Sequence, residues 1–484
     1  MKRVGNLYNQ MLTRHTMEEA FRGVMKDKKQ KDNPNSLSFM MKNNKEYYIA
    51  DAADILSRRA FKPRKPREAY RYDKGSGKLR HIQAPILYPD QLIHWALMTV
   101  LREPVFLKGM DHWCCASVKG RGILYAKNFL EKKLDNSLND RKSISVEKQY
   151  KYCLKMDIRK FFEHIDRGIL MKKLESRIKD KEILHLCSQI IYSIPGTGLP
   201  LGYYTSQWFA NFYLQEFDHY LREVLMPKYG VDTYIRYMDD MIILGSNKRK
   251  LERLMNEISE FLATLSLELK NTSCIFDIST RDIDFIGYRF SYGKTTLRKG
   301  ILHRGLSSNQ NLYKGKFTLK KLRSASAYNG WFKSADTREY QNKYFEGSRK
   351  LEAVKMKEAL AEERLNKESS KEYIHLRKIE NNILNLREET ENGDGKVLIR
   401  YYGNSEEVRV VARTHYTFPE DLEENKVTSI EIDKKTKKKR RRRNASNTSY
   451  YPSAEIYFSD MDKADCIKAY NSNIIQNESL VSTV

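Results

Sequence analysis

The sequence predicts an α+β protein in which helices back an open antiparallel sheet. Apolar runs with alternating residues indicate strands at 152–157 and 234–244. Apolar residues recur at helical spacing over 251–265, and glycines mark a β-hairpin over 282–298. Because these elements follow each other in the order β-α-α-β-β-α-β, one sheet covered by helices is the expected arrangement.

Length and charge define the broad class of protein. The chain has 484 residues, 40% of them hydrophobic, which suits about two to four domains with a large core. It carries 88 Lys and Arg residues against 62 Asp and Glu residues, a formal net charge of +26. This excess indicates a polyanionic partner, most simply nucleic acid, although a generally basic soluble surface is the alternative. The 31 tyrosines also suit stacking on unpaired bases.

The cysteines and the hydropathy pattern argue against several other classes. The 6 cysteines include no C-x-x-C pair, so neither a zinc site nor a disulfide framework is expected. The N-terminus lacks the apolar segment of a signal peptide, and no run is long enough for a membrane span. A cytoplasmic protein with no membrane partner is therefore expected.

The N-terminal third contains a basic hairpin. Residues 1–65 mix weak helical periodicity with polar loops, and 72–85 read as two strands around a glycine turn. Leu79 to Ala84 is the expected returning strand, and Lys74, Lys78 and Arg80 cluster around the hairpin, where they suit phosphate oxygens. An ordinary surface hairpin is the alternative. Amphipathic helices are expected at 91–102 and from Ile123, the second after two glycines that could place a phosphate at its N-terminus.

Two later segments carry candidate site residues. Asp157 ends the strand that begins at Tyr152, where it is a candidate site residue or a strand-end cap. Asp166 is the expected N-cap of the helix that follows. In the segment 196–225, a glycine-rich loop leads into a long helix, and Gln207 lies in its first turn. Glycines in such a loop let the backbone approach a ligand closely.

Two adjacent acids, Asp239 and Asp240, join the apolar runs of the segment Tyr234–Gly245. The pattern predicts two short strands and a tight turn that carries both carboxylates. Adjacent carboxylates repel each other, but they are favourable where a divalent cation lies between them and another carboxylate. A solvated turn is the alternative.

The C-terminal third changes character twice. It is helical and basic over 305–350, charged and helical over 351–390, and strand-like after Gly393. A dense cation run, 434–443, contains Lys438 and Arg441, and it is expected to bind polyanions without sequence preference.

Together, these motifs resemble the reverse transcriptases over about Arg71 to Tyr344, with the Y-M-D-D segment about eighty residues after Asp157. The resemblance implies a right-hand polymerase with fingers, a palm sheet backed by helices, a helical thumb and, beyond the family core, a small β-rich module. The expected domains are the N-terminal region with fingers (1–150), the palm (151–300), the thumb with a charged extension (301–390) and the β-rich module with its basic loop (391–484).

The resemblance also implies the roles of individual residues. Asp157, Asp239 and Asp240 would be the catalytic carboxylates and, with the backbone oxygen of Ile158, would hold two Mg²⁺ or Mn²⁺ ions. The other implied contacts are the triphosphate for Lys78 and Arg80, the sugar for Phe162, the template and incoming base for Gln207, the pyrophosphate for Lys270, the primer for Gly287 and Tyr288, and nucleic acid in the thumb for Trp331.

The branch of the family is predicted from the helix that carries Gln207. The text L-P-L-G-Y-Y-T-S-Q has Leu201 where maturases and retron enzymes usually have Gln, and Gln207 where they have Pro. This form resembles the diversity-generating retroelement enzymes and the bacterial defence-associated enzymes. The long extension past residue 350 favours antiphage defence, with mutagenic retrohoming as the alternative.

Two other classes of protein are the alternatives to a reverse transcriptase. A viral-type RNA replicase is opposed by Met238 and Phe162, and a non-catalytic RNA-binding scaffold is opposed by the three carboxylates. The implied partners are an RNA template, including a cognate non-coding RNA, the DNA product and deoxynucleotides. A protein partner or a homo-oligomer stays open, as do the bacterial or phage origin, the priming mode and the template.

Overall fold

The computed structural model describes residues 3–26, 28, 36–73, 77–135, 145–313, 319–340, 396–401, 408–413 and 454–457. These residues fall into two compact units, which are described separately. The first contains 1–4, 65–85 and 102–363, and the second contains 5–64, 86–101 and 364–484. The predicted domain boundaries at 150, 300 and 390 remain predictions.

The second unit begins with a helical cluster. Its helices are α1 (Leu7–Met11), α2 (Arg14–Met25), α3 (Leu37–Asn43), α4 (Lys45–Ser57) and α5 (Leu92–Leu101). Thr13 caps α2, because its side chain accepts a hydrogen bond from the backbone N–H of Thr16. Helix α2 packs against α4 and α5, and it buries Met17 and Phe21.

Three C-terminal strands form an antiparallel sheet in the order β10-β11-β12 (Lys396–Tyr401, Val408–Arg413 and Ala454–Tyr457). They agree with the predicted β-rich module. The cation run 434–443, with Lys438 and Arg441, lies outside the described residues.

The first unit holds the predicted palm. Four strands form an antiparallel sheet in the order β4-β5-β3-β6, with bounds Thr233–Tyr237, Asp240–Gly245, Tyr152–Asp157 and Cys274–Asp277. The predicted hairpin at 282–298 is instead a three-stranded sheet, β7-β8-β9 (Ile283–Phe285, Tyr288–Ser291 and Lys294–Leu297), because a second turn at Gly293 returns the chain once more.

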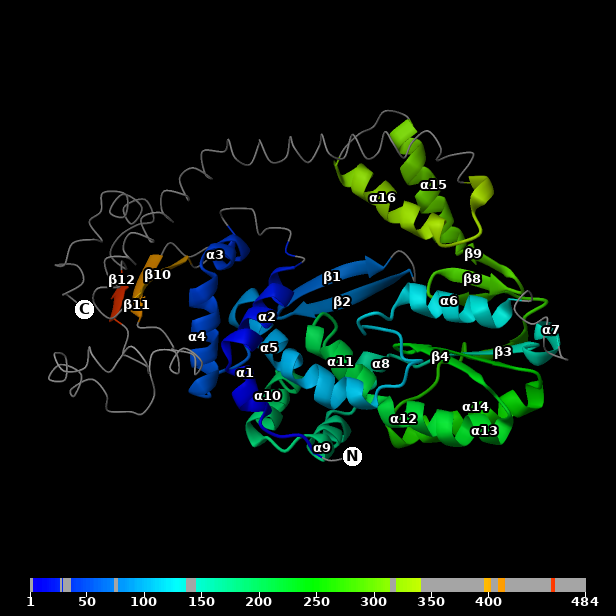
Figure 1. Ribbon diagram of the computed structural model, residues 1–484, viewed down its shortest axis with the longest axis horizontal. Helices are drawn as coiled ribbons and strands as arrows, with labels where there is room; N and C mark the ends of the chain where they lie inside the picture. Colours follow the sequence, from blue (N-terminus) through cyan, green and yellow to red (C-terminus); the bar gives the residue numbers. More distant parts are fainter. Residues whose placement is uncertain are drawn as a thin grey trace, which may run out of the picture. The chain divides into compact units, whose positions relative to one another are not determined.

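The helices of this unit surround the four-stranded sheet and extend beyond it (Figure 1). They are α6 (Ile123–Leu134), α7 (Val146–Gln149), α8 (Phe161–His164), α9 (Arg167–Arg177), α10 (Lys181–Ile191), α11 (Tyr204–Tyr213), α12 (Gln215–Tyr220), α13 (Met226–Tyr229), α14 (Lys248–Thr264), α15 (Lys299–Tyr313) and α16 (Leu319–Lys333). Asp166 caps α9 as predicted, since Ile169 N donates to its Oδ1 at 2.8 Å.

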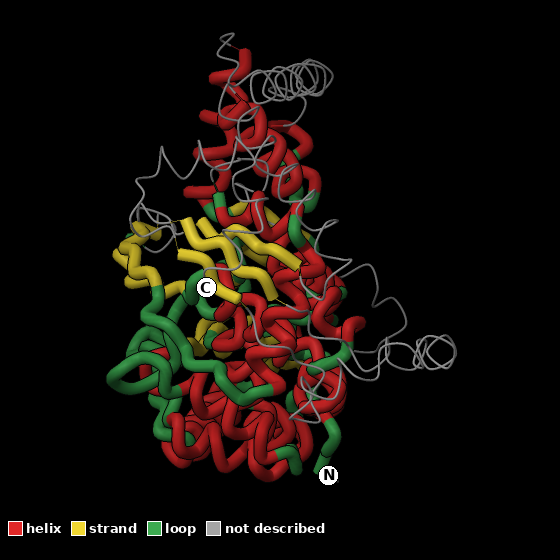
Figure 2. Tube along the Cα trace, turned by 90° about the vertical axis from the view of Figure 1, so that its left-hand side faces the viewer, coloured by secondary structure: helices red, strands yellow, loops and turns green. Residues whose placement is uncertain are grey.

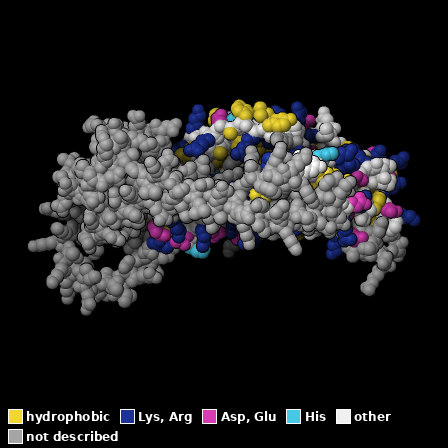
Figure 3. Space-filling view, turned by 90° about the horizontal axis from the view of Figure 1, so that it is seen from above, with side chains coloured by type: hydrophobic (Ala, Val, Ile, Leu, Met, Phe, Trp, Pro, Cys, Tyr) yellow, Lys and Arg dark blue, Asp and Glu magenta, His cyan; other side chains and the backbone are white. Residues whose placement is uncertain are grey.

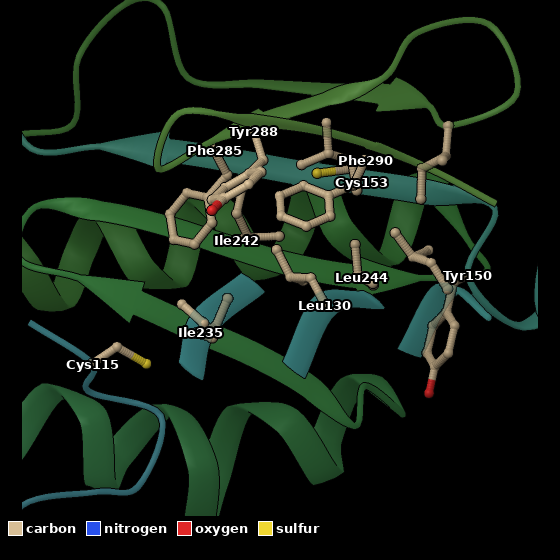
Figure 4. Close-up of a cluster of buried hydrophobic side chains, with 14 of the residues drawn as sticks. Cys115, Leu130, Tyr150, Cys153, Ile235, Ile242, Leu244, Phe285, Tyr288 and Phe290 are labelled. Carbon is tan, nitrogen blue, oxygen red and sulfur yellow. The ribbon is translucent and has the colours of Figure 1, made fainter. Parts of the chain in front are cut away.

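Two layers cover the faces of the four-stranded sheet. On one face, Cys153, Ile242 and Leu244 pack against β7–β9 and against Leu130 of α6 (Figure 4). On the other, α14 contacts β3 and β6 and buries the apolar stripe predicted from its spacing, namely Leu251, Leu254, Ile258 and Leu262. Strand alternation explains both layers, because neighbouring residues of β5 point to opposite faces.

Helices α15 and α16 pack side by side as a pair, where the helical thumb was predicted (Figures 1 and 2). The charged helical extension predicted for 351–390 lies outside the described residues. Among the residues that the structure describes, no helix has the length and apolar character of a membrane span.

Candidate active site

Strand register brings the predicted carboxylates to one end of the sheet. Asp157 ends β3 and pairs directly with Asp240, the first residue of β5. Asp239 lies in the turn before Asp240, and its carbonyl accepts a hydrogen bond from Ile158 N at 3.3 Å. Met238 takes a left-handed conformation in this turn, with φ of 57°. The three acids therefore meet where β3 and the β4–β5 turn lie side by side.

Burial and mutual repulsion shift the pKa values of two of these acids. Burial raises the pKa of Asp239, and the charge of Asp157 raises it further. Burial, followed by the charges of Asp239 and Asp157, raises the pKa of Asp240 to about 6. Asp239 and Asp240 therefore disfavour their own ionised form, so a cation beside them would be stabilising.

The residues present suit a hard divalent cation, because carboxylate oxygens are the ligands that Mg²⁺ and Mn²⁺ prefer. A positive group already lies among them, since the Lys270 ammonium forms a salt bridge with Asp157. No three His, Cys, Asp or Glu side chains in the described part of the chain form a ready metal-binding group. Ile158 is fully buried beside Asp157, and its neighbour Arg159 donates through its backbone N to Glu268 O at 2.8 Å.

A buried polar network supports the turn that carries Asp239. The Arg236 side chain donates from Nε to Asp218 Oδ1 at 2.9 Å and from its terminal nitrogens to Asp218 Oδ2 at 2.5 Å and Asn211 Oδ1 at 3.1 Å. It also donates to the Met238 carbonyl at 3.1 Å, and the Tyr234 hydroxyl donates to Asp218 at 2.8 Å. Arg236 and Tyr234 are 0% exposed and Asp218 and Asn211 are 1% exposed, so the network is part of the core.

The Asp218 carboxylate keeps Arg236 charged in this core. Burial lowers the pKa of the guanidinium, but the charge and hydrogen bonds of Asp218, with smaller effects from Cys114 and Tyr234, together offset this and raise it. The sequence analysis missed both residues. The available signal was an arginine within the apolar strand run at 233–237, because a charge there requires a partner of opposite sign.

The same network reaches the loop before α6. Asn211 Nδ2 donates to Ala116 O at 2.9 Å, and the next residue, Ser117, donates from its hydroxyl to Gln207 Oε1 at 2.8 Å. The Gln207 amide group is therefore held with its oxygen toward Ser117. Farther back in this loop, Arg236 N donates to Trp113 O at 3.0 Å, and Cys115 N donates to Arg236 O at 3.0 Å.

Phe162 lies beside the glycine-rich loop. It is half-buried on α8, its ring lies 5.6 Å from the ring of Phe161, and its carbonyl accepts a hydrogen bond from Leu199 N at 2.7 Å. A Cβ on Gly198 would lie 2.3 Å from this carbonyl, and Gly198 has φ of 71°, so only glycine fits. The structure thus explains the predicted close backbone approach as a contact between loop and α8.

The basic hairpin consists of β1 (Arg67–Asp73) and β2 (Lys78–Ala84). Both Lys78 and Arg80 are exposed, and Arg80 pairs with Asp73 at 3.2 Å. Burial and the charge of Asp157 raise the pKa of Asp239, and the charges of Lys270 and then Arg80 offset part of this rise. The hairpin is held at its base, because Gln83 N donates to Leu201 O at 2.7 Å.

The predicted primer-binding residues Gly287 and Tyr288 are buried in the core. The Tyr288 side chain is 1% exposed, and its ring centroid lies 5.0 Å from that of the partly buried Trp331 (Figure 4 shows Tyr288 beside Phe285). A Cβ on Gly287, which has φ of 93°, would lie 2.8 Å from the Trp331 ring. Because the Tyr288 ring is enclosed, it is unavailable for stacking on nucleic acid, and the backbone turn at Gly287 is what remains for such a contact.

Comparison with known proteins gives one family and one curated relative. Residues 74–290 match the model of the family described as reverse transcriptase (RNA-dependent DNA polymerase). Over 131 residues, the chain is 32% identical to the Retron Ec73 reverse transcriptase of Escherichia coli. This alignment covers 25% of this chain and 40% of the relative. The match therefore spans two fifths of the length of that relative.

Solved telomerase structures show a weaker likeness. One from Candida albicans, with a fragment of telomeric RNA, has a TM-score of 0.34 at 13% identity and covers 57% of this chain and 54% of its own. An apo structure from Candida tropicalis has a TM-score of 0.39 at 12% identity, and the coverage is 55% and 52%.

Proposed function

We propose, from the premise that residues 74–290 form a reverse transcriptase domain, that the protein is an RNA-directed DNA polymerase that copies an RNA template into cDNA. The observation that carries the proposal is the meeting of Asp157, Asp239 and Asp240 at one end of the palm sheet. These acids lie inside the matched residues, and strand register pairs Asp157 with Asp240. The curated relative is a retron enzyme, so it does not support the predicted resemblance to the diversity-generating and defence-associated enzymes.

In this proposal, Asp157, Asp239, Asp240 and the backbone oxygen of Ile158 would hold two Mg²⁺ or Mn²⁺ ions. When bound, such ions lower the pKa of the attacking 3′ hydroxyl and stabilise the pyrophosphate leaving group. Lys270, which pairs with Asp157, lies where it could exchange this partner for the pyrophosphate. Between reaction cycles, the ion pair of Lys270 with Asp157 would keep the site from carrying unbalanced negative charge.

Other residues would position the nucleic acid and the nucleotide. Lys78 and Arg80 would bind the triphosphate of a deoxynucleotide, and electrostatic reach from Arg80 to Asp239 supports this assignment. The Ser117 hydroxyl donates to Oε1 of the Gln207 amide, so the NH₂ group of this amide would donate to a base pair. Minor-groove acceptors occur on every base pair, so such a donor would accept any template sequence.

A primer-extension assay tests the proposal. We expect the purified chain to extend a DNA primer on an RNA template with deoxynucleotides and Mg²⁺, and we expect EDTA to stop the extension. Asp157→Asn should remove the activity. Extension that is absent in Mg²⁺ and in Mn²⁺ would leave the alternative of a non-catalytic RNA-binding scaffold.

Phe162→Ala is expected to raise ribonucleotide incorporation relative to deoxynucleotide incorporation on the order of tenfold or more. The physical reason is steric, because the half-buried Phe162 ring would lie beneath the sugar and would leave no room for a 2′ hydroxyl. Competition of both nucleotides in one reaction measures the ratio. Phe162→Tyr, which keeps the ring, should retain the selectivity of the parent, and equal discrimination by the Ala variant would refute the assignment.

We place the biological role in antiphage defence in the bacterial cytoplasm, with a cognate non-coding RNA as template. The long extension past the polymerase residues supports this role over mutagenic retrohoming, which is the second candidate. Sequencing the nucleic acid that copurifies with the protein separates them. One defined RNA with its cDNA would support defence, whereas cDNA carrying scattered substitutions would support diversification.

A further inference from the structure

Lys155 lies on β3, the strand that ends in Asp157. The two residues are two positions apart, so they share the face on which Cys153 packs against β7–β9. On this face, Lys155 is half-buried opposite Ile242 of β5. A charged group in such a position requires a polar partner. The partner of Lys155 therefore identifies the element that this side chain holds.

The Lys155 ammonium donates a hydrogen bond to the backbone carbonyl of Asp284 on β7. Strand β7 is at the edge of the sheet β7-β8-β9, where a carbonyl needs a partner other than a neighbouring strand. Asp284 lies two residues before the turn formed by Ile286 and Gly287, which have φ of 46° and 93°. The contact therefore links the strand of Asp157 to the turn that is available to the primer.

Arg298 holds the same turn from the other side of the chain. Its Nε donates to Asp284 Oδ1 at 2.8 Å, and its backbone N donates to the Gly287 carbonyl at 3.0 Å. Arg298 directly precedes α15, and its carbonyl accepts a hydrogen bond from Ile301 N at 2.8 Å. Lys155, Asp284 and Arg298, here called the turn network, thus connect β3, the β7–β8 turn and the start of α15.

The ion pair within the turn network contributes little to folding stability. The Arg298 and Asp284 side chains are 40% and 41% exposed, and ion pairs this exposed are weak. The network nevertheless fixes three elements relative to each other at the predicted primer contact. A role in placing the turn therefore explains these contacts better than a role in stabilising the fold.

We infer that Lys155 is a positioning residue that fixes the Ile286–Gly287 turn, and through it the 3′ end of the primer, at a set distance from the carboxylates. The inference rests on the proposed function. A contact made by the backbone of a turn depends on the groups that hold the turn in place. Because the reacting atoms must approach to about 3–3.5 Å, a shift of about 1 Å in the turn is enough to slow the reaction.

Single-turnover primer extension by Lys155→Met, which keeps an apolar side chain and removes the donor, tests the inference. We expect the maximal rate at saturating deoxynucleotide to fall on the order of tenfold to a hundredfold. The deoxynucleotide concentration that gives half of this rate should stay close to that of the parent. The affinity for primer–template, measured without metal, should also change little, because many other Lys and Arg side chains lie on the surface (Figure 3).

Two further variants make the result specific. Arg298→Met cuts the turn network at its exposed ion pair, so it should fold like the parent and lower the same rate. Because both residues hold one turn, the loss in the double variant should differ from the product of the single losses by about twofold or more. Lys151→Met removes a lysine that directly precedes β3 and pairs with Asp277 at 3.9 Å, and it should extend primers like the parent.

Cross-linking gives a readout that needs no DNA synthesis. The primer carries 4-thiothymidine as its 3′-terminal nucleotide, and metal and deoxynucleotides are left out. We expect irradiation of the parent to cross-link the peptide that contains Ile286 and Gly287, as identified by mass spectrometry. At equal bound primer–template, Lys155→Met should lower this yield severalfold. The yield from a 4-thiothymidine placed one helical turn upstream should not change.

Four outcomes would overturn the inference. They are a parental rate in Lys155→Met, a loss in the half-saturating concentration instead of the maximal rate, single losses that simply multiply in the double variant, and an unchanged 3′-terminal cross-link. Should Lys155→Met fail to fold, Arg298→Met takes its place in the rate and cross-linking measurements. If the cross-links behave as expected but the parent makes no DNA, the proposed function fails while the turn network stands.

Discussion

Asp239→Asn is expected to abolish DNA synthesis while the protein keeps its affinity for primer–template. The loss should be at least about a hundredfold, because removing even the outer partners of metal ligands costs about 10- to 100-fold. Binding should persist, since the exposed basic side chains are unchanged. Primer extension and anisotropy on the same preparations measure both quantities, and near-parental extension by the variant would disprove the site assignment.

The same variant should not lose stability in the absence of metal. Burial and the charge of Asp157 raise the pKa of Asp239, so its ionised form is less favourable in the folded than in the unfolded protein. Removing the charge should therefore raise the melting temperature at neutral pH, and the difference should fade as the pH falls through the raised pKa. Asp277→Asn is a control of opposite sign at the other end of the sheet, because hydrogen bonds from Ser279 lower the pKa of Asp277 and removing its charge should lower the melting temperature.

Arg236→Met is expected to destabilise the protein by about 3–5 kcal/mol, because it leaves the Asp218 carboxylate buried without its partner. Urea unfolding measures this change. The double variant Arg236→Met/Asp218→Leu should recover much of the stability, since well-packed apolar residues can replace a buried ion pair. Arg14→Met, which breaks the exposed pair of Arg14 with Glu46, should change little.

Activity should separate the two roles of Arg236. The double variant still lacks the donor that holds the Met238 carbonyl, so its turn is less fixed even when its stability is restored. We expect its kcat to stay low with little change in KM for deoxynucleotides, whereas a purely structural role predicts that kcat returns with stability. Recovery of both the stability and the kcat would show that Arg236 serves the core alone.

Local sequence patterns predicted the individual helices and strands better than the contacts between them. The strands, the α14 stripe and the Asp166 cap were predictable because each depends on residues within a few positions. Arg236 and Asp218 are 18 residues apart and lie on a strand and a helix, so no local period links them. The burial of Tyr288 has the same cause, because the Trp331 ring that covers it comes from a distant helix.

The candidate site was predictable in composition and only partly in geometry. The pair Asp239–Asp240 is local, but the meeting of Asp157 with Asp240 depends on a strand register that composition does not reveal. The two faces of the β1–β2 hairpin were within reach of the sequence. The alternation of Tyr70, Arg71 and Tyr72 already separates rings from charge, yet exposure on both faces required the structure.

The segment 113–115, which precedes α6, covers an edge of the four-stranded sheet that could otherwise pair with another chain. Strand β4 is at the edge of its sheet, and an uncovered edge invites pairing with another chain. The hydrogen bonds between Arg236 and the 113–115 segment occupy backbone groups that a second molecule would otherwise use. Because this segment leaves the ribosome before β4 does, the cover is already available when the edge strand forms, and aggregation between nascent chains is disfavoured.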